Sequence, residues 1–375
     1  ARLDDGGLLV ISRWLQSPPS EELRAWALVL TALEESGVDD VPRRLVALRS
    51  WSTILILARS GAFTADELAA VREFCAQRQF DLVYLPDMAP EEANRYNVLS
   101  GTPYAIAFRE LLDAPDRRAF YAGREYDVRP PRDDRPFFFH FFTWGQVPAI
   151  LQELGHTWKP FGGGGYLVLL ALLAVAVLSA ASLVLVPAVL GVGRRRRGRG
   201  RVLVYFGLLG LGFLAVEIPL LQRFILFLGH PTTAFAAVVA SLLLFSGMGS
   251  LLARRVPLCG ALAALVVIVL LTAAAVGPLF DALLGAPLAL RLLATALSLA
   301  PLGLLLGMPF PLGLAWLERD APDLVPWAWA VNGSASVVSS VAVALGALSA
   351  GLTAVLAAAV VAYALAGLAA ASAPR

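Results

Sequence analysis

The stretch Val202–Phe227, VLVYFGLLGLGFLAVEIPLLQRFILF, decides the class of this protein. It is long enough to cross a bilayer as a helix, which takes about 20 apolar residues. Yet Glu217 lies close to its middle and is followed by Pro219, Gln222 and Arg223. An ionised side chain at that depth costs roughly 2.5–3.5 kcal/mol on insertion scales, so it normally faces a protein interior or a polar cavity. The stretch therefore predicts a membrane helix that carries a candidate site.

A basic run, Arg194–Arg201 with the sequence RRRRGRGR, precedes this stretch directly. Loops beside membrane spans carry an excess of arginine and lysine on the cytoplasmic side. The run is therefore predicted to form a cytoplasmic loop, and no nucleic-acid partner is expected from it. If each apolar stretch spans the membrane, the basic residues that connect or follow the later spans fall on the same side: Arg254, Arg255, Arg319 and the C-terminal Arg375.

Composition separates the chain into two parts. Of the 375 residues, 58% are hydrophobic and 15% are charged, and the mean hydropathy is +0.72, whereas soluble domains carry about 25% charged residues. The residues up to Gly165 have a net charge of −5, and those from Tyr166 onward have a net charge of +7. Cys75 and Cys259 lie in different parts and the three histidines are scattered, so neither a disulfide framework nor a metal site is indicated. A slightly acidic globular part is thus expected to precede a membrane domain.

Seven apolar runs of about spanning length follow the globular part. The first is expected to be a tether, and the other six, over 202–371, a membrane domain: Tyr166–Leu190, Val202–Phe227, Thr232–Leu252, Leu258–Val276, Leu288–Pro311, Trp327–Leu348 and Leu352–Ala370. The sequence therefore predicts a multi-pass protein of the cell (inner) membrane, whose partner is the lipid bilayer.

The globular part, over 1–125, has the order of an α/β domain. Gly6–Leu15 is a turn followed by an apolar run, as expected for a strand buried on both faces. Helices are predicted from Glu21 and from Ala65, where Thr64 gives a start signal. Strands are predicted over Leu45–Leu48, Thr53–Ala58 and Phe80–Leu85, and the close pair among them suggests an antiparallel finish to a largely parallel sheet. The expected fold is a partial Rossmann-like α/β domain followed by an all-α polytopic membrane domain of about seven transmembrane helices.

The turn at Leu3–Ser12, LDDGGLLVIS, resembles the segment that follows the catalytic residues in spermidine synthases and their methyltransferase relatives. The α/β order is likewise similar to the second half of a class I S-adenosylmethionine-dependent transferase fold, although another α/β domain would also fit these residues. In that family the nucleotide loop, the acid on the ribose and the catalytic aspartate precede this turn. The resemblance therefore implies an N-terminally truncated fragment that is inactive alone, in which no catalytic or cofactor-binding residue can be named. It implies S-adenosylmethionine or its decarboxylated form as cofactor, and a polyamine or other small amine as acceptor.

The junction over 126–165 contains Tyr126–Phe142, YDVRPPRDDRPFFFHFF. It resembles the aspartate-aspartate-arginine-proline-aromatic sequence at the end of the catalytic domain in membrane-fused, spermidine synthase-like proteins. The resemblance implies that Asp133, Asp134 and Arg135 lie at the mouth of an active site. Alternatively, the two acids pair with the arginine and cap the fold. The aromatic residues are expected at the level of the lipid headgroups, where amphipathic rings collect: Phe137–Phe142, Trp144 and Trp158.

Three segments of the membrane part look like the membrane domain of the same spermidine synthase-like proteins: Gly212–Arg255, Gly307–Leu314 and Trp327–Ser340. Prolines in the second should break a helix, and broken helices at membrane depth tend to line cavities. The functional hypothesis is an intramembrane polar pocket formed by Glu217, Gln222, Asn332, Pro309 and Pro311. The alternative is that these residues serve helix packing around a neutral Glu217, with small residues at the helix contacts. Arg223 is near the helix end and is expected to extend to the interface.

The sidedness of the α/β domain stays open. If Tyr166–Leu190 spans and the basic loop is cytoplasmic, the domain lies outside, away from a cytosolic cofactor, whereas the family resemblance favours a cytoplasmic domain. One candidate function is a membrane-anchored aminopropyl- or methyltransferase-like enzyme. The alternative is a transporter- or channel-like protein with a degenerate or regulatory α/β domain, and a third is a scaffold subunit of a larger membrane complex.

Overall fold

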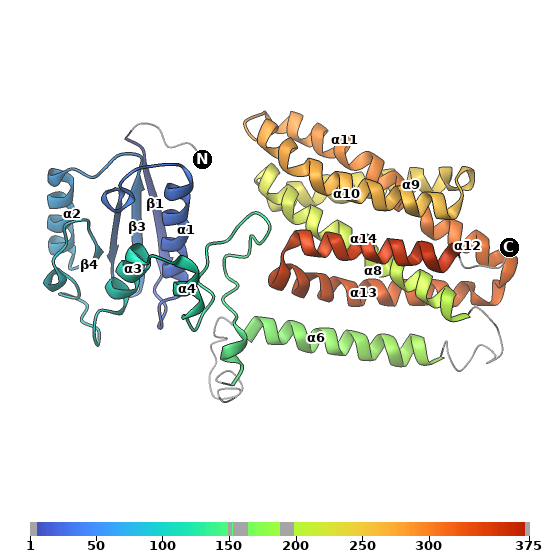
Figure 1. The fold of residues 1–375 in the computed structure, drawn as a ribbon, viewed down its shortest axis with the longest axis horizontal. Coiled ribbons are helices and arrows are strands. Elements are labelled where there is room, and N and C mark those ends of the chain that lie inside the picture. The colour runs from blue at the N-terminus through green and yellow to red at the C-terminus, as the bar shows by residue number, and fades with distance from the viewer. Residues whose placement is uncertain (1–5, 149–151, 153–163, 188–198, 372–375) are drawn as a thin grey trace. The chain divides into compact units, whose positions relative to one another are not determined.

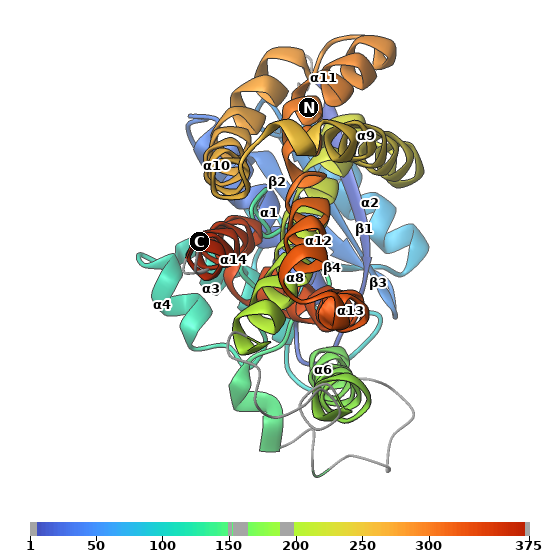
Figure 2. The same ribbon diagram turned by 90° about the vertical axis from the view of Figure 1, so that its right-hand side faces the viewer.

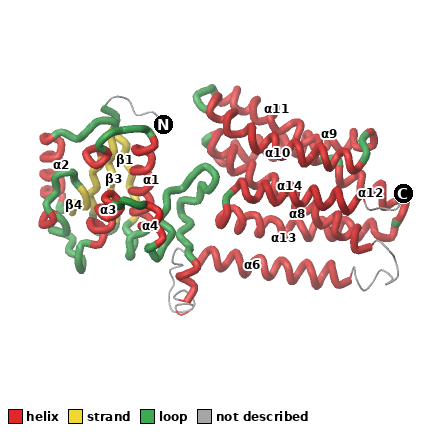
Figure 3. The backbone as a smooth tube through the Cα atoms, viewed as in Figure 1, coloured by secondary structure: helices red, strands yellow, loops and turns green. Residues whose placement is uncertain are grey.

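The computed structural model describes residues 6–148, 152, 164–187 and 199–371. The chain divides into two compact units. The α/β unit comprises Ala1–Arg132 and Pro136–Gly165, and the bundle comprises Asp133–Arg135 and Tyr166–Arg375. In the described part of the chain, strands occur only in the α/β unit (Figure 3).

The α/β unit is built on a four-stranded sheet (Figure 1). The strands follow the order β1-β3-β2-β4, and each neighbouring pair is antiparallel. Helices α1 and α3 pack on one face of the sheet and α2 packs on the other, with a hydrophobic core on each side. The elements are β1 (Leu8–Trp14), α1 (Glu21–Glu35), β2 (Leu45–Arg49), β3 (Thr53–Arg59), α2 (Ala65–Arg78), β4 (Asp81–Tyr84), α3 (Pro103–Asp113) and α4 (Arg117–Ala122), with short 3-10 turns at η1 (Val41–Arg44), η2 (Pro90–Glu92) and η3 (Trp144–Gln146).

The alternation of side chains along β3 explains the two cores. Ile54, Ile56 and Ala58 belong to the core beneath α1 and α3, while Leu55 and Leu57 pack against the core beneath α2. This is the two-residue period of a strand with both faces covered. β2, between β3 and β4, is buried along its whole length.

The predicted burial of β1 on both faces is wrong. Leu8, Leu9 and Val10 are 39–50% exposed, because β1 lies at the edge of the described sheet and pairs only with β3. The expected largely parallel sheet is also wrong for the described strands, whose pairs are all antiparallel. The predicted antiparallel pair is present as β2 and β3. Since β1 and β2 both run antiparallel to β3, they run in the same direction as each other, and α1 connects them.

The aromatic residues of the junction divide into buried and exposed groups. Phe141 and Phe142 are buried in the α/β unit, so the predicted headgroup position is wrong for them. The buried Arg24 guanidinium stands 4.4 Å above the Phe141 ring, lies 3.6 Å from Oδ1 of Asp127 and donates to the backbone oxygens of Asp127 and Phe138. Phe139 and Trp144 are 69% and 66% exposed and remain candidates for the interface. Trp158 lies outside the described residues.

Among its described residues, the bundle contains seven helical spans that are long and apolar enough to cross a membrane, as the sequence predicts. The predicted break in the fifth span is also present, since Gly307 and Met308 separate α11 from α12. The spans are α6 (Gly164–Ala180) continued by a π-type turn at η4 (Ala181–Leu185), α8 (Arg199–Leu228), α9 (Pro231–Leu252), α10 (Leu258–Leu283), α11 (Leu288–Leu306) with α12 (Pro309–Asp320), α13 (Val325–Ala350) and α14 (Leu352–Ala371); η5 (Ala253–Arg255) and η6 (Pro322–Leu324) are connecting turns.

Helix α8 is central to the bundle, where it contacts α9, α11, α12, α13 and α14 (Figure 2). Glycines allow very close helix contacts, as the sequence predicts. A Cβ atom on Gly307 would stand 1.9 Å from the backbone oxygen of Ser246, and a Cβ atom on Gly249 would stand 1.9 Å from that of Leu304. Small residues at such contacts let two backbones touch, which is how membrane helices gain packing energy without a hydrophobic driving force between them.

Candidate functional site

The helix directions define two ends of the bundle. Asn332 and Ser336 of α13 donate hydrogen bonds to the backbone oxygens of Phe206 (3.1 Å) and Gly210 (3.3 Å) in α8. Since the residue numbers increase in the same order in both helices, α8 and α13 run in the same direction. We call the end where α13 stops and α14 starts the Gly351 end, and the end where α8 starts the Arg201 end.

Basic residues collect at the Arg201 end. The Arg201 guanidinium stands 5.3 Å above the ring of Trp316 in α12, the helix that also carries Arg319. The turn η5, which carries Arg254 and Arg255, contacts α12 as well. The predicted cytoplasmic loop Arg194–Arg201 lies outside the described residues up to residue 198, but its described end belongs to this same group.

The segment Asp133–Arg135 is bound at the opposite, Gly351 end. The Oδ1 atom of Asp134 accepts hydrogen bonds from the backbone N–H of Thr353 (2.8 Å), from the Thr353 hydroxyl (2.5 Å) and from Nη2 of Arg223 (3.1 Å). The backbone oxygen of Asp134 accepts a further bond from the N–H of Leu352 (2.8 Å). Arg223 also donates to the Thr353 hydroxyl (2.6 Å), so three side chains from distant parts of the sequence form one cluster.

Asp134 acts as an N-cap for α14. A helix begins with four N–H groups that have no partner within the helix, and the residue before α14 is Gly351, which has no side chain to supply one. The carboxylate of Asp134 takes that place and adds a negative charge at the positive end of the helix dipole. Burial opposes ionisation of this carboxyl, but the hydrogen bonds from Thr353 and Arg223 outweigh it and hold its pKa below the ordinary value.

The neighbours of Asp134 behave differently. Nη2 of Arg135 donates to the backbone oxygen of Leu348 (2.7 Å), in the last turn of α13, where cations are favoured by the helix dipole. Asp133 is exposed and forms no hydrogen bond with another described residue. The segment therefore holds two helix ends through Asp134 and Arg135. The partner of Asp134 is Arg223 and not Arg135, and no structural feature of these contacts identifies an active-site mouth.

Glu217 is a half-buried carboxyl in the middle of α8. It lies 18 residues after Arg199 and 11 before Leu228, or about 27 Å and 17 Å along the helix. It is seven residues from Gly210, so it lies about 20° from Gly210 around the helix, on the face that meets α13. Across the described chain, Glu217 forms no hydrogen bond or ion pair.

The other residues of the hypothetical pocket are not gathered around Glu217. Asn332 meets Phe206, and the backbone oxygen of Pro309 accepts a hydrogen bond from the Tyr205 hydroxyl (2.7 Å). Phe206 is 11 residues from Glu217 in α8, or about 17 Å along the axis. Pro311 belongs to α12, in which the ring of the preceding Phe310 lies 5.4 Å from the ring of Phe206.

Gln222 lies on a different face of α8 from Glu217, so the two side chains do not line one pocket. It is five residues after Glu217, which places it about 140° away around α8. The structure thus brings Asn332 to the broken helix near the Arg201 end and leaves Glu217 apart from both.

Three residues that the sequence did not predict as contact sites are Gly351, Thr353 and Arg291. Nη1 of Arg291 in α11 donates to the backbone oxygen of Phe227 (2.6 Å) and so caps the end of α8. Gly351 between two apolar runs was a visible signal for a helix break. Nothing near Gly351 in the sequence points to Asp134 as its partner.

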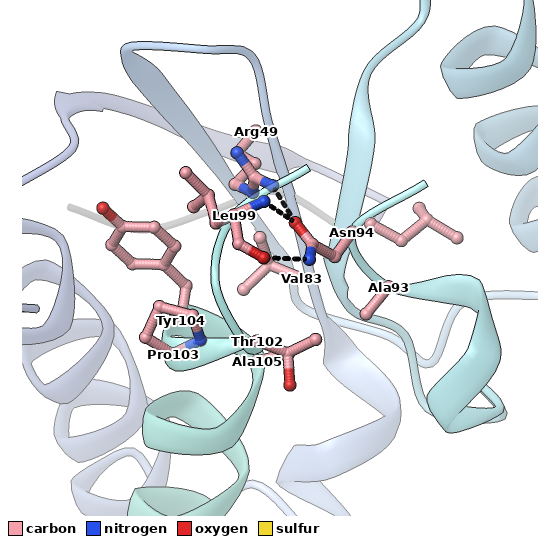
Figure 4. A pocket seen from close by; sticks show the side chains of 10 residues that line it. Arg49, Val83, Ala93, Asn94, Leu99, Thr102, Pro103, Tyr104 and Ala105 are labelled. Carbon is pink, nitrogen blue, oxygen red and sulfur yellow. Dashed lines mark hydrogen bonds between the residues drawn. The ribbon is translucent and has the colours of Figure 1, made fainter. Parts of the chain in front are cut away.

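The α/β unit contains a small pocket lined by Arg49, Asn94, Leu99 and Tyr104 (Figure 4). Its volume is about 10 Å³, room for a single water at most. Its arginine is already bound, since Nη2 of Arg49 lies 3.1 Å from Oδ2 of Asp81 and donates to Oδ1 of Asn94 (2.9 Å). The pocket is thus part of a buried polar network and cannot hold a nucleoside or a polyamine.

No cluster of three or more histidine, cysteine or acidic side chains suited to a metal occurs among the described residues.

The chain was compared with protein-family models, curated proteins and solved structures, and no match was found in any of the three. The resemblances in the junction and membrane segments therefore remain expectations from the sequence. What the structure adds is a membrane bundle with one unpartnered carboxyl in mid-helix, among the described residues, and a polar cluster at one end.

Proposed function

We propose that the bundle carries the activity, as a transporter- or channel-like membrane protein for a cationic solute or protons, with the α/β unit in a regulatory role. The observation that carries this proposal is Glu217: a half-buried carboxyl near the middle of a 30-residue helix, without a partner in the described chain. Ionisable residues inside membrane spans are costly, and they commonly mark ion or proton pathways. Arg223 and Arg291 contrast with Glu217, since both bind protein acceptors near helix ends.

The broken helix adds support. The fifth span is interrupted at Gly307 and Met308, and α12 starts at Pro309. Discontinuous helices free backbone groups that can line a path through the membrane. The helix break lies toward the Arg201 end, and Glu217 lies farther toward the Gly351 end. A cation or proton that moves along α8 would therefore meet the two features one after the other.

Flux measurements on proteoliposomes test this proposal. Radiolabelled putrescine and a proton-sensitive dye such as pyranine serve as probes, because a carboxylate pairs with an ammonium group or a proton. We expect flux above that of empty liposomes, its loss in Glu217→Gln, and its retention in Asp281→Asn, which alters an exposed acid near the end of α10. Equal flux in Glu217→Gln and the unaltered protein would refute the role of Glu217, and no flux above empty liposomes would refute the proposal for these probes.

A second candidate is an S-adenosylmethionine-type transferase of the spermidine synthase-like group. The sheet favours it: β1 and β2 run in the same direction on either side of the antiparallel β3, and α1 joins them. A strand–helix–strand connection with an antiparallel strand between its two strands agrees with the antiparallel finish that the sequence predicts. Its cofactor would be S-adenosylmethionine or the decarboxylated form and its acceptor a small amine or polyamine.

The transferase candidate is tested on the protein made from the entire coding sequence. It requires, upstream of Ala1, a glycine-rich loop after a strand and an acid about 20 residues later. The protein should then transfer label from S-adenosylmethionine or its decarboxylated form to putrescine. Absence of these upstream motifs, or of any transfer with both donors, would exclude this candidate.

Membrane orientation tests the transferase candidate, which requires the α/β unit to be on the cytoplasmic side. Segment Asp133–Arg135 is bound at the Gly351 end, and the basic residues lie at the Arg201 end. If arginine-rich ends face the cytoplasm, the chain entering and leaving this segment is on the non-cytoplasmic side. A transferase with a cytosolic cofactor requires the reverse.

The orientation can be measured by labelling single exposed cysteines with a membrane-impermeant maleimide. Ser36→Cys reports on the α/β unit and Arg255→Cys on the Arg201 end, in a Cys259→Ser background; Cys75 is only 3% exposed. If the arginine-rich end faces the cytoplasm, Ser36→Cys should be labelled in intact cells and Arg255→Cys only after permeabilisation. The opposite pattern would support the transferase and contradict the orientation proposed above.

A further inference from the structure

The segment Asp133–Arg135 belongs to the bundle although the chain on both sides of it belongs to the α/β unit. Its attachment uses both backbone and side chains: the Asp134 backbone oxygen binds Leu352, the Asp134 carboxylate binds Thr353 and Arg223, and Arg135 binds the Leu348 oxygen. This three-residue segment is thereby bound to three helices of the bundle, α8, α13 and α14.

The receiving site is shaped for Asp134. Gly351 has φ +95°, and a Cβ atom on it would stand 2.3 Å from Oδ2 of Asp134. A side chain at position 351 would therefore displace the carboxylate. The Asp134 carboxylate serves two groups at once. It supplies a hydrogen-bond acceptor to the start of α14 and a counter-charge to the Arg223 guanidinium. An arginine with 16% of its side chain exposed gains more from such a partner than one in bulk water.

The same contact reaches the helix that carries Glu217. Arg223 is six residues after Glu217, about 9 Å along α8. Pro219 lies between them inside the helix. A proline removes one hydrogen bond of the helix ladder and is a common place for a helix to bend.

We propose that Asp133–Arg135 is a latch through which the α/β unit controls the Arg223 end of α8, with Pro219 as the pivot. When the latch is closed, Asp134 holds the last part of α8 against the start of α14. When the segment withdraws, α14 loses its cap, Arg223 loses its counter-charge, and the part of α8 beyond Pro219 is free to move relative to Glu217. The regulatory consequence at Glu217 rests on the proposed function above, whereas the latch itself does not.

Hydrogen exchange of the whole protein in lipid nanodiscs tests the latch. In Asp134→Ala we expect exchange to quicken roughly fivefold to tenfold at the amides of Leu352 and Thr353, the loss that corresponds to a missing N-cap. The amides of 220–228 should quicken as well, while those of 203–216 stay unchanged. Asp133→Ala is the matched control, since it removes the adjacent, exposed carboxylate and should change neither region. Thr353→Val, which keeps the backbone N–H but removes the hydroxyl, should quicken the same amides to a smaller extent.

Two results would overturn the latch. One is an unchanged Leu352 amide in Asp134→Ala, since this amide binds the Asp134 backbone and is exposed only if the segment leaves. The other is a uniform change along α8, which would remove Pro219 as the pivot. Flux measured on the same variants separates the latch from its consequence: if Glu217→Gln has no effect on flux, the proposed function fails, while the exchange result for Asp134→Ala stands on its own.

Discussion

Replacing Gly351 by alanine tests whether the bundle depends on the contact with Asp134. Gly351 has φ +95° and ψ 167°, a backbone region that only glycine adopts at low cost, and another residue there costs about 1–3 kcal/mol. The new Cβ atom would stand 2.3 Å from Oδ2 of Asp134, so the carboxylate must leave. Gly351→Ala therefore combines backbone strain with the loss of the cap.

The lost contacts add a smaller amount. An N-cap is worth about 1 kcal/mol. The ion pair with Arg223 adds at most about 0.5 kcal/mol, because 43% of the Asp134 side chain is exposed and solvent screens it. Reduced entropy of the unfolded chain returns about 0.5 kcal/mol. The free energy of unfolding should thus fall by roughly 2–4 kcal/mol.

The assay is unfolding of the protein in mixed micelles by titration with SDS, followed by tryptophan fluorescence. Gly333→Ala is the matched control, because Gly333 lies inside α13 and a methyl group on it would meet nothing within 4 Å. Alanine there should be neutral or stabilising by roughly 0.5–1 kcal/mol. A change below about 0.5 kcal/mol in Gly351→Ala would show that the segment does not hold the Gly351 end, and would contradict the capping role of Asp134.

Three further changes test other parts of the structure. Gly307→Ala should destabilise the bundle by about 1–3 kcal/mol in the same titration, because its Cβ atom would stand 1.9 Å from the backbone oxygen of Ser246. Burial raises the pKa of Glu22 from an ordinary 4.5 to about 8, despite hydrogen bonds from backbone N–H groups. Because the folded protein binds this proton more tightly than the unfolded chain, protonated Glu22 stabilises the fold fully below pH 4.5, and this contribution is lost as the pH rises through 8. The free energy of unfolding should therefore fall by up to roughly 4–5 kcal/mol over that range. Glu22→Gln should remove this dependence of stability on pH. Asp81→Asn should cost about 3–5 kcal/mol, because it leaves the buried Arg49 without its counter-charge.

Each of these changes has a control and a contrary result. Gly247→Ala, in α9 with open space around it, should leave the bundle as stable as before, and equal losses at both glycines would contradict the contact geometry. A flat pH profile in the unaltered protein would show that Glu22 is not kept neutral by burial. Asp87→Asn alters an ion pair whose acid is 57% exposed and should cost less than about 1 kcal/mol. If it costs as much as Asp81→Asn, burial is not the cause of the difference.

Features governed by neighbouring residues could be predicted from the sequence. The helix start at Thr64 is confirmed in detail: its hydroxyl accepts from the N–H of Glu67 (3.3 Å), and the Glu67 carboxylate accepts from the N–H of Thr64 (2.8 Å). Such a capping box needs only a spacing of three residues. The apolar spans and the break before Pro309 likewise follow from local composition, and the structure contains both.

Features that depend on distant partners could not be predicted. The apolar run at Leu8–Val10 has the composition of a covered strand, but exposure depends on which elements stand beside it, and the described sheet supplies a neighbour on one side only. The cap of α14 joins Asp134 to Thr353, 219 residues away. Arg223 could be placed near the interface from its position in the helix, but its partner could not be named, because no periodicity connects position 223 with the junction.

The pairing of Arg223 bears directly on the unpaired Glu217. The two charged side chains of α8 are six residues apart, about 120° around the helix, so they do not have the spacing of an ion pair within one helix. The structure assigns the arginine to Asp134 and Thr353 at the Gly351 end, so its charge is already balanced there. A carboxylate in low-dielectric surroundings needs a countercharge or a proton, and the described chain leaves Glu217 with neither an arginine nor a hydrogen-bond donor. Because the described residues supply no partner at this level of α8, the proposed function has the charge that balances Glu217 come from outside the chain, as a proton or a small cation that reaches it through the bundle.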